Sequence, residues 1–193
     1  ASEKFFSQKT YQVGQGRIRL QSPDANDPQV QKLLQRFRTI PYVEYDNTMD
    51  RVHTLTGANF AVLRDALERV GPFDERLGPG ASGTSEDIEL VRRFTRAGIS
   101  IGYMQDAIAY HRVDRSRLTE EYFKYLHKKQ GKSRLLIKDR SVPHILFGIC
   151  GMTALYGINC LLSRERRRYR SKGRIYHYLG MLEEKWNGQA DKQ

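Results

Sequence analysis

Short stretches of alternating or helically spaced apolar residues occupy the first part of the chain. Residues 13–20 predict a strand interrupted by two glycines, and the turn-rich residues 22–28 predict a loop. Apolar positions at helical spacing predict a short helix over residues 30–37, which Pro41 is expected to end. The chain therefore begins with a strand, a loop and a helix.

The next stretch continues this alternation. Residues 54–62 predict a strand in which Gly57 marks a bulge or a close backbone approach. A short helix over residues 64–70 leads to a glycine-rich loop at residues 77–85. We interpret this loop as a mobile lid or an acceptor loop.

A longer helix and two strands follow the loop. Residues 86–97 predict a helix with one apolar stripe, formed by Ile88, Val91 and Phe94. Two short strands are predicted at residues 99–103 and 107–111, on either side of a turn at Asp106. Thr119 then predicts the N-cap of a long helix with an aromatic side.

The last third of the chain has a different pattern. Residues 144–162 are 19 positions without Asp, Glu, Lys or Arg, and an arginine-rich segment at residues 164–174 follows. A bilayer span needs about 20 apolar residues, so the uncharged run is only marginally long enough. A transmembrane helix, an interfacial hairpin and a buried helix pair with a basic rim all remain open.

Charge separates the same two regions. The net charge is +11, and residues 1–123 hold 17 Lys/Arg against 17 Asp/Glu, whereas residues 124–193 hold 16 against 5. A basic surface of this kind meets nucleic acid or an anionic membrane. Nucleic acid leaves the uncharged run unexplained, so we favour an anionic membrane surface. Amphipathic aromatic residues in the tail are expected at such an interface: Tyr169, Tyr176, Tyr178 and Trp186.

Cysteine usage favours the cytoplasmic face of a membrane. Cys150 and Cys160 lie ten positions apart in one apolar run, which puts them on different faces of a helix. A disulfide is therefore not expected, and a reducing compartment is. The chain begins at Ala1 rather than at a methionine, so we expect it to be trimmed from a longer protein.

The sharpest motif pattern spans residues 56–111. It consists of TGANFAVLRDALERVGPFDERLG, the glycine-rich loop, SED at residues 85–87, a helix ending in RAG, and AIAYHRV. This succession resembles the C-terminal half of the catalytic domain of family 2 glycosyltransferases. The resemblance covers about residues 13–130 and is strongest over 56–112.

The resemblance implies an α/β fold that is part of a GT-A domain. Residues 1–120 would form its acceptor-side half, and residues 121–193 a helical, membrane-associated extension. The implied activity is inverting transfer of a sugar from a nucleotide-sugar donor to a hydroxyl of a glycan or a lipid-linked acceptor. The alternatives are a non-catalytic relative that binds a glycan or a membrane and, with less support, a basic nucleic-acid-binding module.

The acidic pair Glu86 and Asp87 matches the family's catalytic position. The second acid serves there as general base, so Asp87 is expected to remove the proton of the acceptor hydroxyl. A structural interpretation competes with this one: Thr84 and Asp87 also fit a capping box, and acids in a first turn favour the helix dipole.

Two further positions follow from the resemblance. Gly57, Ala58 and Asn59 match the small-residue segment that passes near the sugars, where the Asn59 amide could bond a hydroxyl. His111 matches a residue that can complete the coordination of a divalent metal ion, Mn²⁺ or Mg²⁺. A packed histidine and a bulged core strand are the structural alternatives.

The main metal motif of the family is a D-x-D pair, and this chain contains none. The nearest approximation, Asp24-Ala25-Asn26, lies in the turn-rich loop. We therefore expect the donor-nucleotide half and the main metal motif outside this chain, and we expect the chain alone to be inactive.

Overall fold

The structure is a computed structural model that describes residues 1–8, 10–21 and 27–190. The chain forms two compact units that alternate along the sequence: unit 1 holds residues 1–25, 40–74 and 86–113, and unit 2 holds residues 26–39, 75–85 and 114–193. The chain passes from unit 1 to unit 2 for the last time between residues 113 and 114, close to the domain boundary predicted at residue 120. That the two parts fold independently stays a prediction. Asp24-Ala25-Asn26 and most of the predicted loop at residues 22–28 lie outside the described residues.

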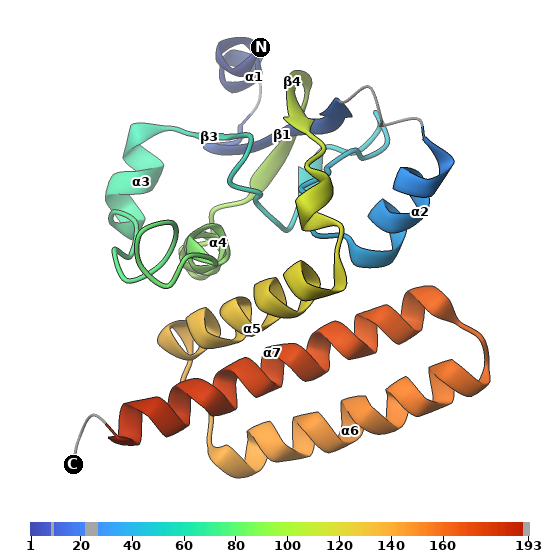
Figure 1. Ribbon diagram of the computed structural model, residues 1–193. Coiled ribbons are helices and arrows are strands. Elements are labelled where there is room, and N and C mark those ends of the chain that lie inside the picture. Colours follow the sequence, from blue (N-terminus) through green and yellow to red (C-terminus); the bar gives the residue numbers. More distant parts are fainter. Residues whose placement is uncertain (9, 22–26, 191–193) are drawn as a thin grey trace. The chain divides into compact units, whose positions relative to one another are not determined.

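Unit 1 is built on a four-stranded mixed sheet with the order β2-β4-β1-β3 (Figure 1). The strands are β1 (Val13–Gln21), β2 (Arg51–Val52), β3 (Phe60–Val62) and β4 (Ile101–Arg112). β1 and β4 run parallel, whereas β3 pairs antiparallel with β1 and β2 antiparallel with β4. The predicted α/β class is confirmed at this level.

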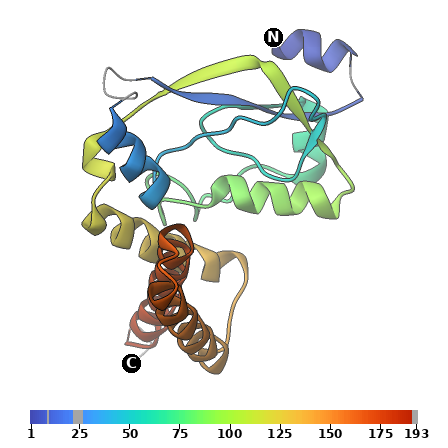
Figure 2. The same cartoon turned by 90° about the vertical axis from the view of Figure 1, so that its right-hand side faces the viewer.

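Three helices belong to unit 1: α1 (Ser2–Gln8), α3 (Arg64–Val70) and α4 (Glu86–Arg96). Figure 2 shows α4 along one face of the sheet, and its Leu90 and Phe94 are fully buried in the core with Val13 and Ile18 of β1. The predicted stripe is therefore displaced. Leu90 and Phe94 enter the core, while Ile88 and Val91 are only half-buried.

The two strands predicted around Asp106 are wrong as separate elements, because β4 is continuous from Ile101 to Arg112. Gly16 of β1 pairs with Met104, and the next residue, Arg17, pairs with Ile108. Three residues of β4 are thus accommodated in a bulge, which keeps the strand in the sheet while interrupting the ladder. An exposed bulge at Asp106 carries the polar residues that suggested a turn.

Two other predicted boundaries differ. Residues 54–59 are irregular, with a turn at residues 57 and 58, and only Phe60–Val62 of the predicted strand pairs with β1. Helix α2 (Pro28–Phe37) ends well before Pro41, because Arg38 takes a left-handed conformation with φ 52° and its N–H donates to the carbonyl of Leu34. This is a backbone C-cap, so the proline is not needed to end the helix.

Unit 2 contains three long helices besides α2: α5 (Glu120–Ile137), α6 (Val142–Leu161) and α7 (Glu165–Ala190), with a short 3₁₀ turn, η2 (Arg115–Arg117), before α5. Thr119 caps α5 as predicted, because its hydroxyl accepts the N–H of Tyr122 at 3.2 Å. α7 packs against both α5 and α6 (Figure 1). Within the described residues, α6 is the one helix long and apolar enough to cross a membrane, and only 11% of its apolar window is buried.

Candidate functional site

The structure brings the acidic pair and Gly57 together. Asp87, in the first turn of α4, accepts the backbone N–H of Gly57 through Oδ2 at 3.2 Å. A Cβ placed on Gly57 would lie 3.6 Å from Oε1 of Glu86 and 3.9 Å from Oδ2 of Asp87. Gly57 and Ala58 are exposed and the two acids are half-buried, so both carboxylates border an accessible surface of small residues.

A capping box between Thr84 and Asp87 does not account for the position of Asp87. α4 begins at Glu86, and the Thr84 hydroxyl makes its hydrogen bonds with the hydroxyls of Ser85 and Ser133, at 3.3 and 3.0 Å. Asp87 Oδ1 accepts the N–H of the next residue, Ile88, at 2.8 Å. The predicted capping box is therefore absent, although both acids still stabilise the helix dipole from the first turn.

The glycine-rich loop before α4 is fastened by hydroxyl groups. Ser133 of α5 donates to the Ser82 hydroxyl at 2.9 Å and bonds the Thr84 hydroxyl at 3.0 Å. Ser85, the last residue before the helix, is buried and has a φ of 75°, a conformation that a non-glycine residue adopts at a free-energy cost of about 1–3 kcal/mol.

A buried glutamine, Gln15 of β1, shapes the turn that presents Gly57. Its Oε1 accepts the N–H of Thr56 at 2.5 Å, and its Nε2 donates to the carbonyl of Asn59 at 2.9 Å. The side chain is completely inaccessible to solvent. Sequence reasoning missed Gln15, and the only signal for it was a polar residue between two glycines in a predicted strand.

Asn59 fastens the other end of the turn. Its Nδ2 donates two hydrogen bonds of 2.8 Å, one to the carbonyl of Arg17 and one to the carbonyl of Ala107 in the β4 bulge. Both amide N–H groups thus hold the sheet together instead of facing a ligand. Gly16 has no room for a side chain, because a Cβ there would overlap the Asn59 amide and lie 2.7 Å from the Ala107 carbonyl.

His111 stands apart from this cluster. It lies four residues beyond Ala107 on β4, roughly 13 Å along an extended strand. Its Nδ1 donates to the carbonyl of Arg112 at 2.9 Å, so a neutral ring keeps the lone pair on Nε2. Among the described residues, no group of three or more His, Cys, Asp or Glu could hold a metal ion. His111 alone does not make a site for Mn²⁺ or Mg²⁺.

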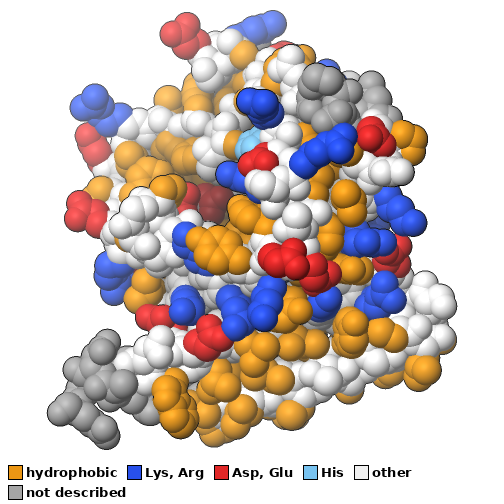
Figure 3. All heavy atoms as spheres, viewed as in Figure 1, with side chains coloured by type: hydrophobic (Ala, Val, Ile, Leu, Met, Phe, Trp, Pro, Cys, Tyr) orange, Lys and Arg blue, Asp and Glu red, His pale blue; other side chains and the backbone are white. Residues whose placement is uncertain are grey.

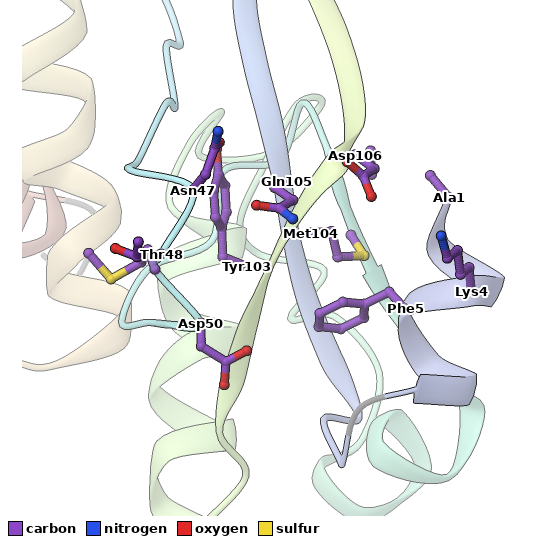
Figure 4. A pocket seen from close by; sticks show the side chains of 12 residues that line it. Ala1, Lys4, Phe5, Asn47, Thr48, Asp50, Tyr103, Met104, Gln105 and Asp106 are labelled. Carbon is purple, nitrogen blue, oxygen red and sulfur yellow. The ribbon is translucent and has the colours of Figure 1, made fainter.

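A separate polar cavity of about 420 Å³ opens in unit 1 (Figure 4). It lies between the first helix, residues 47–50 and the β4 bulge, and Asp50 and Asp106 are among its lining residues. Burial, followed by a 2.8 Å hydrogen bond to Asp50, raises the pKa of Tyr11 above its ordinary value. The acidic pair is not among the residues that line this cavity.

Three comparisons with known proteins extend this description no further. No protein-family model matches the chain, and no curated protein and no solved structure matches it. The candidate site therefore stands on its geometry and on the motif resemblance of residues 56–112.

Proposed function

We propose that this chain is the acceptor-side part of an inverting glycosyltransferase with a GT-A fold. One observation carries the proposal: a carboxylate at the start of α4, Asp87, is hydrogen-bonded to the exposed Gly57-Ala58 turn. The Thr84 hydroxyl bonds Ser133 and does not form a capping box with Asp87, although Asp87 also accepts the first-turn N–H of Ile88. A mixed α/β unit around the pair is compatible with the proposed fold.

In the proposed reaction, the acceptor hydroxyl lies over the Gly57-Ala58 turn, where small residues leave room for a sugar. Asp87 takes the hydroxyl proton while that oxygen forms a bond to the anomeric carbon. The bond from the anomeric carbon to the donor phosphate breaks, and the nucleoside diphosphate leaves with its electron pair. Attack on the face opposite the leaving group inverts the configuration. Each Asp87 oxygen accepts one backbone N–H and keeps a second lone pair for the proton.

The proposal assigns the donor nucleotide to a part of the protein outside this chain. A divalent metal ion, Mn²⁺ or Mg²⁺, would neutralise the charge of the donor diphosphate when bound. The described residues do not provide its ligand set, so no step of the reaction is assigned to the metal here. The partners proposed for the complete protein are a nucleotide sugar and a glycan or lipid-linked acceptor.

We also propose that the protein works at the cytoplasmic face of an anionic membrane and not on nucleic acid. α6 supports this location, because it is uncharged over 20 residues and largely exposed. A lipid-linked acceptor would be presented at the same surface.

Asp87→Asn in the protein encoded by the complete reading frame tests the catalytic role. We expect transfer from nucleotide sugars to fall about 10²- to 10⁴-fold, the usual loss on removing a general base. Asp65→Asn is the matched control, because Asp65 is an exposed first-turn acid of α3 in the same unit. Circular dichroism and the urea midpoint should be unchanged in both variants. Full transfer by Asp87→Asn would overturn the assignment, and glycan binding without transfer in the parent protein would identify a non-catalytic relative.

A further inference from the structure

One side of α6 is a continuous apolar surface. At 3.6 residues per turn, the exposed positions of this helix project onto about half of its circumference. Apart from His144 near the start of the helix, the large exposed side chains in this arc are apolar. Together with the C-cap Leu162 they form a surface that we name the α6 outer face: Leu146, Phe147, Leu155, Ile158, Leu161 and Leu162. Phe147 and Leu161, near opposite ends of the helix, are 81% and 87% exposed. Figure 3 shows apolar side chains gathered over α6.

The opposite side of α6 is covered by α7 along nearly its whole length. Gly148 lies against the Tyr178 ring, where a Cβ would come within 2.5 Å, and Asn159 donates to the Ser171 hydroxyl at 3.4 Å. The later α6 residue, Asn159, contacts the earlier α7 residue, Ser171, so the two helices are antiparallel. Any orientation of α6 in a membrane therefore carries α7 with it.

α7 is poorly suited to accompany α6 through a bilayer. Asn159 of α6 bonds Ser171, and Gly148 lies against Tyr178, so Lys172 and Arg174 lie within the part of α7 that packs along α6. If α6 stood upright, the antiparallel register would carry these two basic residues into the hydrocarbon region. Each such residue costs roughly 2.5–3.5 kcal/mol at the centre of a membrane helix. The structure thus disfavours a transmembrane orientation that length and composition alone allow.

Charged and aromatic groups flank the α6 outer face at both ends. Exposed Lys138 precedes α6, and exposed Arg164, Arg166 and Arg167 follow it. The ion pair of Lys185 with Asp139, at 2.5 Å, places the end of α7 beside the start of α6, and the next residue, Trp186, is 75% exposed. Tryptophan and basic side chains are the groups that settle at the headgroup level of an anionic bilayer.

We propose that the α6–α7 hairpin is a monotopic membrane anchor. α6 lies parallel to an anionic bilayer with its outer face about 5–10 Å into the boundary between headgroups and acyl chains. α7 remains on the water side and supplies cations to the headgroups. Three of the four aromatics expected at the interface are not part of this surface. Tyr169 and Tyr176 pack against Phe123 of α5, and Tyr178 lies against Gly148 on the side of α6 that α7 covers.

Flotation of the 193-residue chain with vesicles of phosphatidylcholine and phosphatidylglycerol tests membrane binding. We expect binding that weakens with salt and falls about tenfold or more in Phe147→Glu, because the lost insertion of one phenylalanine is of that size. Phe73→Glu is the matched control, as Phe73 is an exposed phenylalanine of unit 1, at 42%. Equal binding by Phe147→Glu and the parent, or no vesicle binding by the parent, would overturn the proposal. Self-association in the absence of lipid would also overturn the proposal if Phe147→Glu abolished it, because the α6 outer face would then bind a second copy of the chain.

Depth measurements separate a flat helix from a spanning one. Single fluorophores are attached at Phe147→Cys, Ala154→Cys or Leu161→Cys, with Cys150 and Cys160 replaced by alanine. Quenching by lipids labelled at known depths should give one shallow depth for all three positions. A deep central position with shallow ends in opposite leaflets would show a transmembrane helix and refute the monotopic orientation. Neither the flotation experiment nor the depth measurement involves sugar transfer, so both results are independent of the proposed activity.

Discussion

Gln15 shows how one buried polar side chain can set the geometry of an exposed site. Its amide satisfies the N–H of Thr56 and the carbonyl of Asn59, at the two ends of the turn that offers Gly57 to Asp87. A buried polar group without a partner costs about 1–3 kcal/mol, so the turn and the glutamine depend on each other.

Gln15→Leu should therefore destabilise unit 1 by about 1–3 kcal/mol, because the Thr56 N–H loses its partner while the volume is nearly kept. The Asn59 carbonyl still accepts the N–H of Gly16. Gln21→Leu is the control, since Gln21 is an exposed glutamine at the end of the same strand and should change stability by less than about 0.5 kcal/mol. Urea unfolding followed by circular dichroism measures both variants. Hydrogen exchange at the Thr56 amide should accelerate in Gln15→Leu alone, and an unchanged rate would contradict the role of Gln15.

Motif order and spacing single out the acidic pair, Glu86 and Asp87, and the catalytic role of the pair stays a prediction. Gln15 was missed and Asn59 was assigned to a sugar hydroxyl, because their partners are backbone groups more than 40 positions away in the chain. A tertiary hydrogen bond of that kind leaves no periodic pattern, so only the folded structure reveals it.

The helices α5 and α7 meet at backbone distance, and glycines make this possible. A Cβ on Gly131 of α5 would overlap the carbonyl of His177, and a Cβ on Gly180 of α7 would overlap the carbonyl of Lys128. Each helix thus places a glycine against the backbone of the other. The sequence pattern predicted the helices, but it gave no sign of this contact.

Gly180→Ala should force α5 and α7 apart and destabilise unit 2 by about 1–3 kcal/mol, the usual effect of overpacking. The control is Gly157→Ala on α6, where no atom lies within 4 Å of the new Cβ. Since alanine is the better helix former, Gly157→Ala should stabilise the protein by about 0.5–1 kcal/mol. Thermal unfolding distinguishes the two signs. Equal effects of both substitutions would mean that the backbone contact does not limit stability.

Strand β4 shows that local sequence patterns do not predict how strands far apart in the chain pair. Gln105 and Asp106 are polar and exposed, so they suggest a turn between two strands. In the sheet they are accommodated in a bulge, because β1 supplies a continuous parallel partner on both sides of it. Helices α3 and α5 were predicted closely because their caps and periodicity are local, whereas strand pairing over 80 positions is not.

The basic charge of the chain is concentrated in the C-terminal part of unit 2, and two half-buried histidines lie there. Burial, followed by the nearby Arg174, lowers the pKa of His127 on α5 to about 4. Burial and the charges of Arg134, Arg174 and His127 lower the pKa of His177 on α7 to about 4 as well. Protonating either imidazole adds a cation to an already positive region.

This arrangement predicts a loss of stability in mild acid. The unfolded chain takes up these two protons near pH 6.5 and the folded chain only near pH 4, so between these values the unfolded state binds more protons. The free energy of unfolding should therefore fall as pH drops from about 6.5 to 4, by about 1.4 kcal/mol per pH unit for each histidine, and stay flat above pH 7. Carboxylates such as Asp139, whose pKa is lowered by its hydrogen bond to Lys185, act in a more acidic range.

Urea unfolding at pH 5, 6 and 7.5 measures this slope. The single tryptophan, Trp186, belongs to unit 2, so its fluorescence reports on the unit that holds both histidines. Replacing both residues, His127→Gln with His177→Gln, should remove most of the slope whatever it does to absolute stability. His53→Gln, at an exposed position of unit 1, should leave the slope as it is. A double variant with the slope of the parent would show that acid acts elsewhere in the molecule, and the half-buried histidines would then have no part in its pH dependence.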